Sequence, residues 1–208
     1  MAPRRYQMSR RAANVEQTRR RIVEATMALH AEKGVLDTTV ADIAARADVA
    51  VGTIYRHFPT LDDLVDACGQ ATWELAAPPS IAVFADLDSL EERVRRLFLA
   101  FGDVYQRLSE LGMDHAAVRV EGKKVAPVAR WFAAWDELHQ AMVRAALGGD
   151  EDGVEDQTAA AVLRVLSGWE AWRGLNEAGL PGSEAVALLA EIALSWLAGR
   201  SRKEVRPP

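Results

Sequence analysis

The chain has 208 residues, half of them hydrophobic, which is enough for one sizeable core or for a small and a larger domain. Its composition excludes a collagen-like or disordered protein, and its single cysteine, Cys68, excludes an intrachain disulfide framework. The N-terminus has no apolar segment behind its basic residues, and no run approaches the roughly 18 apolar residues that span a bilayer. We therefore expect no membrane partner and a cytoplasmic protein.

The net charge of -5 argues against a uniformly basic nucleic-acid binder, but the charge is unevenly distributed. Residues 1–21 contain seven arginines and one acidic residue, Glu16, which gives +6. Residues 68–208 contain 15 basic and 21 acidic residues, which gives -6. This asymmetry indicates that one end of the chain meets a polyanion and the other does not.

Residues 1 to about 15 lack hydrophobic periodicity, and we expect a flexible basic arm there. The arm is either a solvated tail or a segment that contacts DNA. From about Val15 to Lys33 the apolar residues recur at helical spacing, and Gly34 provides a stop signal. The sequence therefore predicts a first helix that ends at Gly34.

The stretch 38–58 predicts two short helices joined by a tight turn. Thr39 is placed to cap the first, with Asp42 as its acidic partner three residues later. After a turn at 47–49, the second runs from about Ala50 to His57, and Pro59 ends it. Its apolar residues, four positions apart, face the core, which leaves a polar outer side. This arrangement matches helix-turn-helix docking geometry.

The rest of the chain predicts further helices. A fourth runs from about Thr60 to Ala76, and the segment 77–80, with two prolines, marks a boundary. Beyond it the sequence carries four helical patterns and no persistent strand alternation, so we predict an all-α fold. The four patterns are Ser89–Leu111, Ala126–Leu147, Glu155–Ala178 and Ser183–Gly199.

From Thr18 to Ala67 the sequence resembles the TetR/AcrR family of bacterial transcriptional regulators. The matching stretches are TRRRIVEATMALHAEKG, TTVADIAARADVAVGTIYRHFPT and LDDLVDA. The resemblance implies a three-helix DNA-binding domain (16–60), a linking helix (61–76), a helical bundle for ligand binding and dimerisation (77–200) and a tail (201–208). It further implies a ligand-responsive repressor that binds a palindromic operator as a dimer.

Three positions depart from the family pattern. Asp48 stands where glycine is common in the turn, so we expect its backbone to enter the left-handed region. Ala50 stands where serine commonly caps the recognition helix, and Leu61 where a lysine often contacts phosphate. We therefore expect the arginine-rich arm to carry more of the phosphate binding.

The expected DNA contacts divide into two kinds. Tyr55 and His57 match family positions that reach the phosphate backbone, and the hydroxyls of Thr38 and Thr39 can do the same. Thr53 and Arg56 are better placed to read base edges, since arginine pairs bidentately with guanine. Val51 is a candidate for a thymine methyl contact, and Gly52 for close approach of the helix to DNA.

The C-terminal helical patterns predict two further sites. The last two helices are apolar on more than one side, and the resemblance implies that they pair with a second subunit. We expect the dimer interface to contain Val162, Leu166, Trp169, Leu189, Ile192 and Trp196. Aromatic residues nearby form either plain core or an effector pocket for an apolar or aromatic compound. The pocket candidates are Trp73, Phe98, Phe101, Tyr105, Trp131, Trp135, His139 and Trp169.

Two alternatives remain. Asp136 and His139 lie three residues apart, as in a metal-binding helical bundle, but the sequence lacks the second pair and the two glutamates of a di-iron enzyme. A helical adaptor that binds another protein is the other alternative. Because no phosphate-binding loop, zinc signature or nucleophile elbow is present, we expect no catalytic residues, no metal and no cofactor.

Overall fold

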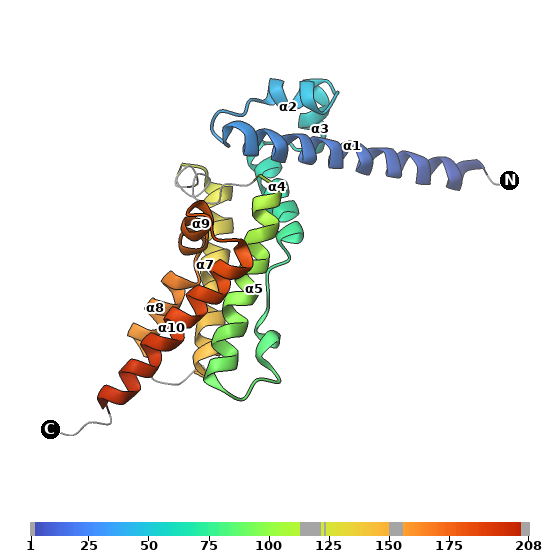
Figure 1. Cartoon of the computed structure of the whole chain (residues 1–208). Helices are drawn as coiled ribbons and strands as arrows, with labels where there is room; N and C mark the ends of the chain where they lie inside the picture. The colour runs from blue at the N-terminus through green and yellow to red at the C-terminus, as the bar shows by residue number, and fades with distance from the viewer. Residues whose placement is uncertain (1–2, 113–121, 123, 150–155, 205–208) are drawn as a thin grey trace. The chain divides into compact units, whose positions relative to one another are not determined.

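The computed structural model describes residues 3–112, 122, 124–149 and 156–204, with side chains from Ala12 to Arg200 within these ranges. As the sequence predicts, every regular element in this part of the chain is helical (Figure 1). The elements are α1 (Pro3–Lys33), α2 (Val40–Arg46), α3 (Val51–His57), α4 (Leu61–Ala76), the 3₁₀ turn η1 (Ile81–Phe84), α5 (Leu90–Glu110), α7 (Ala126–Leu147), α8 (Gln157–Leu166), α9 (Trp169–Glu177) and α10 (Gly182–Glu204).

The helices form two compact units. Unit 1 comprises Met1–Glu74 and Leu111–Trp131, and unit 2 comprises Leu75–Glu110 and Phe132–Pro208. Met113 and residues 150–153, which connect predicted helices, lie outside the described residues, as do residues 205–208 and the side chains of 201–204 in the predicted tail.

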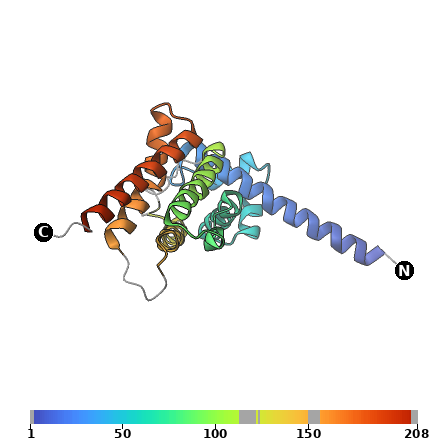
Figure 2. The ribbon, with the colours of Figure 1, turned by 60° about the horizontal axis from the view of Figure 1, so that its bottom comes forward.

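Helix α1 begins at Pro3, well before the start predicted near Val15. Proline is tolerated in the first turn of a helix, and the arginine, glutamine, methionine and alanine residues that follow favour helix without any apolar face. Figures 1 and 2 show this N-terminal part of α1 running past α2 and α3. The backbone of residues 3–15 is thus helical, where the sequence predicts no regular element, while the flexibility of this arm and its contact with DNA stay predictions.

Three helix starts carry the same reciprocal cap. At α2 the Asp42 amide donates to Thr39 Oγ1 at 3.2 Å, and the Thr39 amide donates to Asp42 Oδ2 at 3.0 Å. Thr60 with Asp63 and Ser89 with Glu92 repeat this geometry at α4 and α5. The hydroxyl hydrogen bonds lower the pKa of Asp63 and Glu92 below their usual values. The cap predicted at Thr39 is confirmed.

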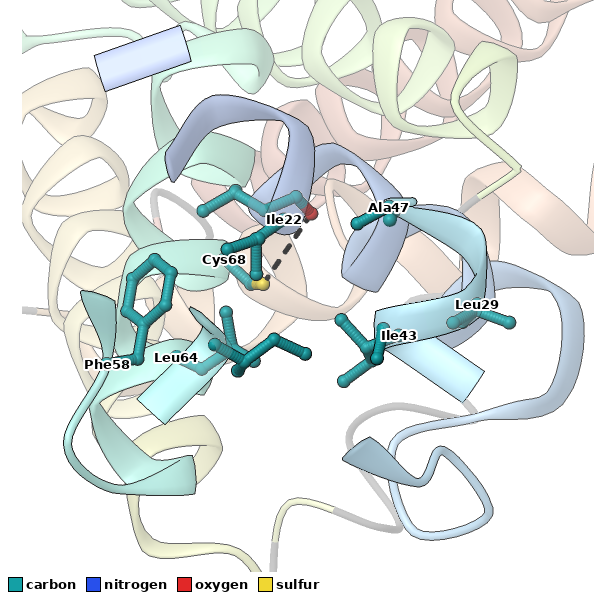
Figure 3. Close-up of a cluster of buried hydrophobic side chains, with 11 residues drawn as sticks. Ile22, Leu29, Ile43, Ala47, Phe58, Leu64 and Cys68 are labelled. Carbon is teal, nitrogen blue, oxygen red and sulfur yellow. Dashed lines mark hydrogen bonds between the residues drawn. The ribbon is translucent and has the colours of Figure 1, made fainter. Parts of the chain in front are cut away.

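The core of unit 1 holds α1 to α4 together (Figure 3). Ile22 and Leu29 of α1, Ile43 of α2, and Leu64 and Cys68 of α4 all lie in it. Cys68 is 4% exposed, and burial raises the pKa of its thiol to about 12, partly offset by the Thr26 hydroxyl. It is therefore an inert core residue.

In unit 2 the predicted single helix 155–178 is broken into α8 and α9 at Ser167 and Gly168. Three hydrogen bonds hold the break. Tyr105 Oη donates to the Ser167 carbonyl at 3.0 Å, and Ser167 Oγ donates to the Leu163 carbonyl at 2.7 Å. His139 Nε2 lies 2.8 Å from Ser167 Oγ and must donate, because the serine proton is already used.

Helix α10 packs along α5 and also contacts α8 and α9. Its segment Gly182–Arg200 is long and apolar enough to cross a membrane by length and composition, with 33% of its most apolar window buried. The expectation that no segment reaches that length was therefore wrong. Two apolar faces explain the composition: Leu189 and Ala193 are buried, whereas Leu188 and Ile192 are exposed.

Candidate nucleic-acid interface and aromatic cluster

Ion pairs with α1 fix the orientation of α2 within unit 1. Lys33 Nζ donates to Asp42 Oδ2 at 2.6 Å, and this bond, with those from Thr39, holds the pKa of Asp42 well below its usual range. Arg46 donates to both carboxylate oxygens of Glu32, at 2.9 and 2.7 Å, which lowers the pKa of Glu32. Sequence reasoning missed both pairs, because their partners lie 9 and 14 residues apart.

The hydroxyl protons of Thr38 and Thr39 are used within unit 1. Thr38 Oγ1 donates to the Gly34 carbonyl at 2.7 Å, and Thr39 Oγ1 donates to Asp42 Oδ2 at 2.6 Å. Since a phosphate oxygen is also an acceptor, either hydroxyl would have to give up its present bond to donate to DNA. These residues therefore position the loop and α2, which modifies the prediction that both hydroxyls contact phosphate.

Helix α3 presents one buried and several exposed side chains. Ile54 is 1% exposed and anchors the helix, while Val51 is 42% and Tyr55 is 45% exposed. Arg56 is also exposed, and Thr53 and His57 are half-buried. The six predicted contact residues of α3 are thus exposed or half-buried, as the spacing indicates. Side chains of this kind can contact bases and phosphates together.

In the turn before α3 and at the start of α3, the structure agrees with two of the features predicted from the sequence. Asp48 has a φ of 51°, in the left-handed region, as predicted. Ala50 makes no capping side-chain hydrogen bond, also as predicted. A Cβ atom at Gly52 would meet nothing within 4 Å, so the fold does not require glycine there. Leu61 is 47% exposed beside the end of α3.

A cation–π contact joins α1 to the end of α3. The Arg19 guanidinium lies 4.5 Å from the ring centroid of Phe58, which is the C-cap residue of α3. Arg19 is thus bound within unit 1, whereas Arg20 and Arg21 are exposed. The sequence, in which these three arginines are consecutive, does not reveal this difference, because it depends on which side of α1 faces Phe58.

The predicted pocket residues fall into two groups, one in each unit. Most of them form a buried cluster in unit 2, in which the Phe101 ring lies 4.3 Å from His139 and 5.6 Å from Trp135. The Tyr105 ring lies 5.5 Å from Trp169. Trp172, which is not among the predicted pocket residues, extends the cluster, with its ring centroid 5.3 Å from that of Trp169. The buried members are Phe101, Tyr105, Trp135, His139, Trp169 and Trp172, and the remaining candidate, Phe98, is buried on α5.

The other two pocket candidates, Trp73 and Trp131, belong to unit 1, where their ring centroids are 5.8 Å apart. Both are half-buried, and Trp131 lies against Gly69 of α4.

The predicted dimer residues differ in exposure. Trp169 and Leu189 are buried in unit 2, so a partner surface cannot reach them without rearrangement. Helical spacing cannot separate these residues, because a helix that is apolar on two sides does not reveal which side its own core takes. Ile192 is 45% exposed, and Val162, Leu166 and Trp196 are half-buried. Two neighbours outside the predicted set of dimer residues, Val165 and Leu188, are exposed.

Asp136 and His139, the pair that suggested a metal site, are placed differently by the structure. His139 is buried, with Nε2 on Ser167 and its ring against Phe101, whereas Asp136 is half-buried. Across the residues with described side chains, no group of three or more His, Cys, Asp or Glu is placed to hold a metal ion.

Comparisons with known proteins agree with this architecture. Residues 22–68 match the family model of bacterial regulatory proteins of the tetR family. The repressor KstR of Mycolicibacterium smegmatis is 35% identical over 92 residues, which cover 44% of this chain and 38% of KstR. The chain thus spans less than half the length of this curated relative. The crystal structure of the multidrug binding protein EbrR with imidazole superposes with a TM-score of 0.54, at 22% identity, over 84% of this chain and 89% of EbrR.

The uncharacterised regulator TtgW of Pseudomonas putida is matched over most of its length. It is 31% identical over 115 residues, which cover 50% of this chain and 85% of TtgW. With the family model on α1 to α4 and an all-helical fold, the chain belongs to the tetR family of bacterial regulatory proteins.

Proposed function

We propose that the protein is a dimeric, sequence-specific DNA-binding repressor that an apolar or aromatic effector releases from a palindromic operator. The observation that carries the proposal is the outer side of α3. Ile54 holds the helix in the core, while Val51, Tyr55 and Arg56 stand exposed. The sequence relative KstR is a transcriptional repressor, which supports repression. Membership of a family of regulatory proteins sets the enzyme alternative aside.

Within this proposal the side chains of α3 have distinct roles. Thr53 and Arg56 read base edges, and Val51 contacts a thymine methyl. Tyr55 and His57 contact phosphates, which fixes the register of the protein on the duplex. Gly52 lets α3 approach the groove closely.

The basic N-terminal stretch adds phosphate contacts. Ala50 supplies no cap and Leu61 no charge, so two phosphate-binding groups common in the family are missing. The four arginines Arg4, Arg5, Arg10 and Arg11 replace them. Deleting residues 2–11 should weaken operator binding and flatten its salt dependence. An unchanged salt slope would contradict this role.

Dimerisation uses the outer faces of α8 and α10, which contact each other in unit 2. Leu188, Ile192 and Trp196 recur every four residues along α10, and Val162 and Val165 lie on α8. Exposed apolar side chains at such spacing require a cover in water. A two-fold copy of the same surface supplies it as a four-helix bundle and presents two copies of α3 to a palindrome.

The effector acts at the aromatic cluster of unit 2. Aromatic rings surround Phe101 and Tyr105 there, next to the hydrogen-bonded polar groups of His139 and Ser167, and an effector must open this buried cluster to reach them. Its fold relative EbrR is a multidrug binding protein that was crystallised with imidazole. An effector can release DNA only by binding the DNA-incompetent conformation more tightly.

Genomic footprinting with the full chain tests the DNA-binding part of the proposal. We expect protection of a palindromic site, with the half-sites one or more helical turns apart. Fluorescence anisotropy on that site against random DNA then gives the specificity ratio. Equal affinity for both DNAs would refute sequence-specific binding.

The effector is tested next by titrating candidate aromatic compounds against operator-bound protein. A compound that releases DNA must bind the free protein more tightly than the complex, by the same factor as it weakens operator binding. A compound that binds equally in both states is not the effector. Failure of every aromatic compound would refute the effector class and leave the DNA-binding result standing.

A further inference from the structure

A tryptophan of α7 lies directly on a glycine of α4 within unit 1. A Cβ atom at Gly69 would come within 2.0 Å of Trp131 Nε1 and 2.3 Å of its Cδ1. Real Cβ atoms do not approach other atoms so closely, so only glycine allows the indole edge to rest on this stretch of backbone. The indole N–H is buried and has no acceptor among the described residues. Close packing, and not a hydrogen bond, therefore holds the ring.

Two further contacts surround this one. Arg130 Nη2 donates to Asp66 Oδ2 at 2.5 Å, and the Trp73 ring lies 5.8 Å from that of Trp131. Asp66, Gly69 and Trp73 are spaced three and four residues apart and so share one face of α4. That face is fixed to two adjacent residues of α7, with a charge pair on one side and a second indole on the other.

A different face of α4 belongs to the core beneath the DNA-binding helices. Leu64 is 1% and Cys68 is 4% exposed, in the same buried cluster as Ile54 and Phe58 (Figure 3). The link between α3 and α4 is short, from Phe58 to Thr60. Because a four-turn helix moves as a rigid unit, a shift of α4 at Gly69 must move Leu64 against α3.

We propose that Trp131 is a positioning residue for operator binding, because its indole, seated on Gly69, fixes α4 and through it the placement of α3. Trp131 acts without touching DNA, and this role differs from the pocket lining that its aromatic character predicted. The inference rests on the proposed operator binding, and it concerns contacts within unit 1 alone.

The substitution Gly69→Ala tests the contact. The methyl group must displace the indole or push α4 away, so we expect the affinity for the footprinted operator to fall about tenfold. Affinity for random DNA should change less, since it depends on charge. Gly174→Ala is the matched control: this helical glycine of α9 has nothing within 4 Å of its Cβ position, so operator affinity should not change. Equal operator affinities for Gly69→Ala and wild type would overturn the proposal.

A double variant separates positioning from simple destabilisation. Trp131→Leu removes the atoms that the new methyl group meets, so Gly69→Ala with Trp131→Leu should bind the operator more tightly than the two single effects combined predict. Thermal unfolding of all four proteins shows that each is folded at the assay temperature. Additive effects on operator affinity would overturn the proposal, because they would mean that the two residues act independently.

Amide NMR of the DNA-free protein tests whether the contact positions α3, independently of whether the protein binds an operator. In Gly69→Ala the resonances of Ile54 and Phe58 should shift, whereas in Gly174→Ala they should not. If wild type binds no operator, the proposed function fails, and these shifts alone decide whether the contact positions α3. Unchanged α3 resonances beside shifted ones at Trp131 would show that the contact is local, and the proposal would be wrong.

Discussion

Thr39 and Asp42 bind each other through three hydrogen bonds at the start of α2. The Asp42 amide donates to Thr39 Oγ1, and the amide and hydroxyl of Thr39 both donate to Asp42 Oδ2, at 3.0 and 2.6 Å. Lys33 adds a fourth bond to the same carboxylate oxygen. The Asp42 side chain therefore takes part in the cap of α2 and also links α2 to α1. Because α3 packs against α2, this residue pair helps to position α3.

Removing the Thr39 hydroxyl should destabilise the folded protein. Thr39→Val keeps the side-chain shape but loses the cap, so we expect a loss of about 1 kcal/mol in the free energy of unfolding. Thr60→Val removes the same kind of cap from α4 and should destabilise the fold by a similar amount. Chemical denaturation measures the free energy of unfolding of both variants. If Thr39→Val leaves stability unchanged, the cap is not formed in solution.

Stability at acidic pH should depend on Asp42. The pKa of Asp42 in the folded protein is lowered, chiefly by the Lys33 hydrogen bond. The ionised carboxylate therefore stabilises the fold at any pH above its unfolded pKa of about 3.9. This contribution decreases below that pH and is lost as pH falls through the folded pKa. The melting temperature of Asp42→Asn should therefore lie below that of wild type at pH 6 to 7, and the gap should narrow below about pH 4. A gap that is constant between pH 7 and pH 3 would contradict the assignment.

Arg56 and Tyr55 should affect DNA binding in different ways. Arg56→Ala should relax the preference at one operator position and lose about 1 to 3 kcal/mol of discrimination there. Tyr55→Phe removes only the phenol hydroxyl, so it should weaken binding about equally on operator and random DNA. Competition binding with operators changed one position at a time measures both effects. Equal losses on operator and random DNA for Arg56→Ala would refute its base-reading role.

Gly52→Ala separates the needs of the fold from those of DNA binding. The added methyl group meets nothing in the protein, so the free energy of unfolding should stay the same or rise by about 0.4 to 1 kcal/mol. Operator affinity should nevertheless fall, because the methyl group occupies space that the groove needs. Retained affinity in anisotropy titrations would show that α3 does not approach DNA closely at this position.

Ile192→Glu should separate the dimer without unfolding the chain. Two-fold symmetry brings two copies of the charge into the apolar interface, so we expect the dimer Kd to rise about a hundredfold or more. Leu99→Glu is the control, because Leu99 is 52% exposed on α5, outside the proposed interface. Sedimentation velocity measures the effect. A dimer that resists Ile192→Glu would place the interface elsewhere.

Local signals explain what could be predicted from the sequence. The cap of Thr39 with Asp42, the left-handed Asp48 and the bounds of α4 and α7 depend on residues a few positions apart. Helical periodicity likewise identified Ile54 as the inner residue of α3 and its neighbours as outer ones. The start of α1 was missed because a helix of polar residues has no periodic signal.

The sequence by itself determined the all-helical class and the helix-turn-helix scaffold, because capping, turn chemistry and periodicity are encoded within a few residues. The family was indicated separately, by the resemblance of residues 18–67 to the TetR/AcrR regulators. Only the tertiary structure decided which face of α10 packs into the core of its own chain. It also decided that the helix predicted over 155–178 breaks at Ser167, which accepts hydrogen bonds from Tyr105 and His139, and that Trp131 rests on Gly69. These features join residues 28 to 62 positions apart. Their physical basis is the close packing of side chains from different helices, which no local pattern specifies.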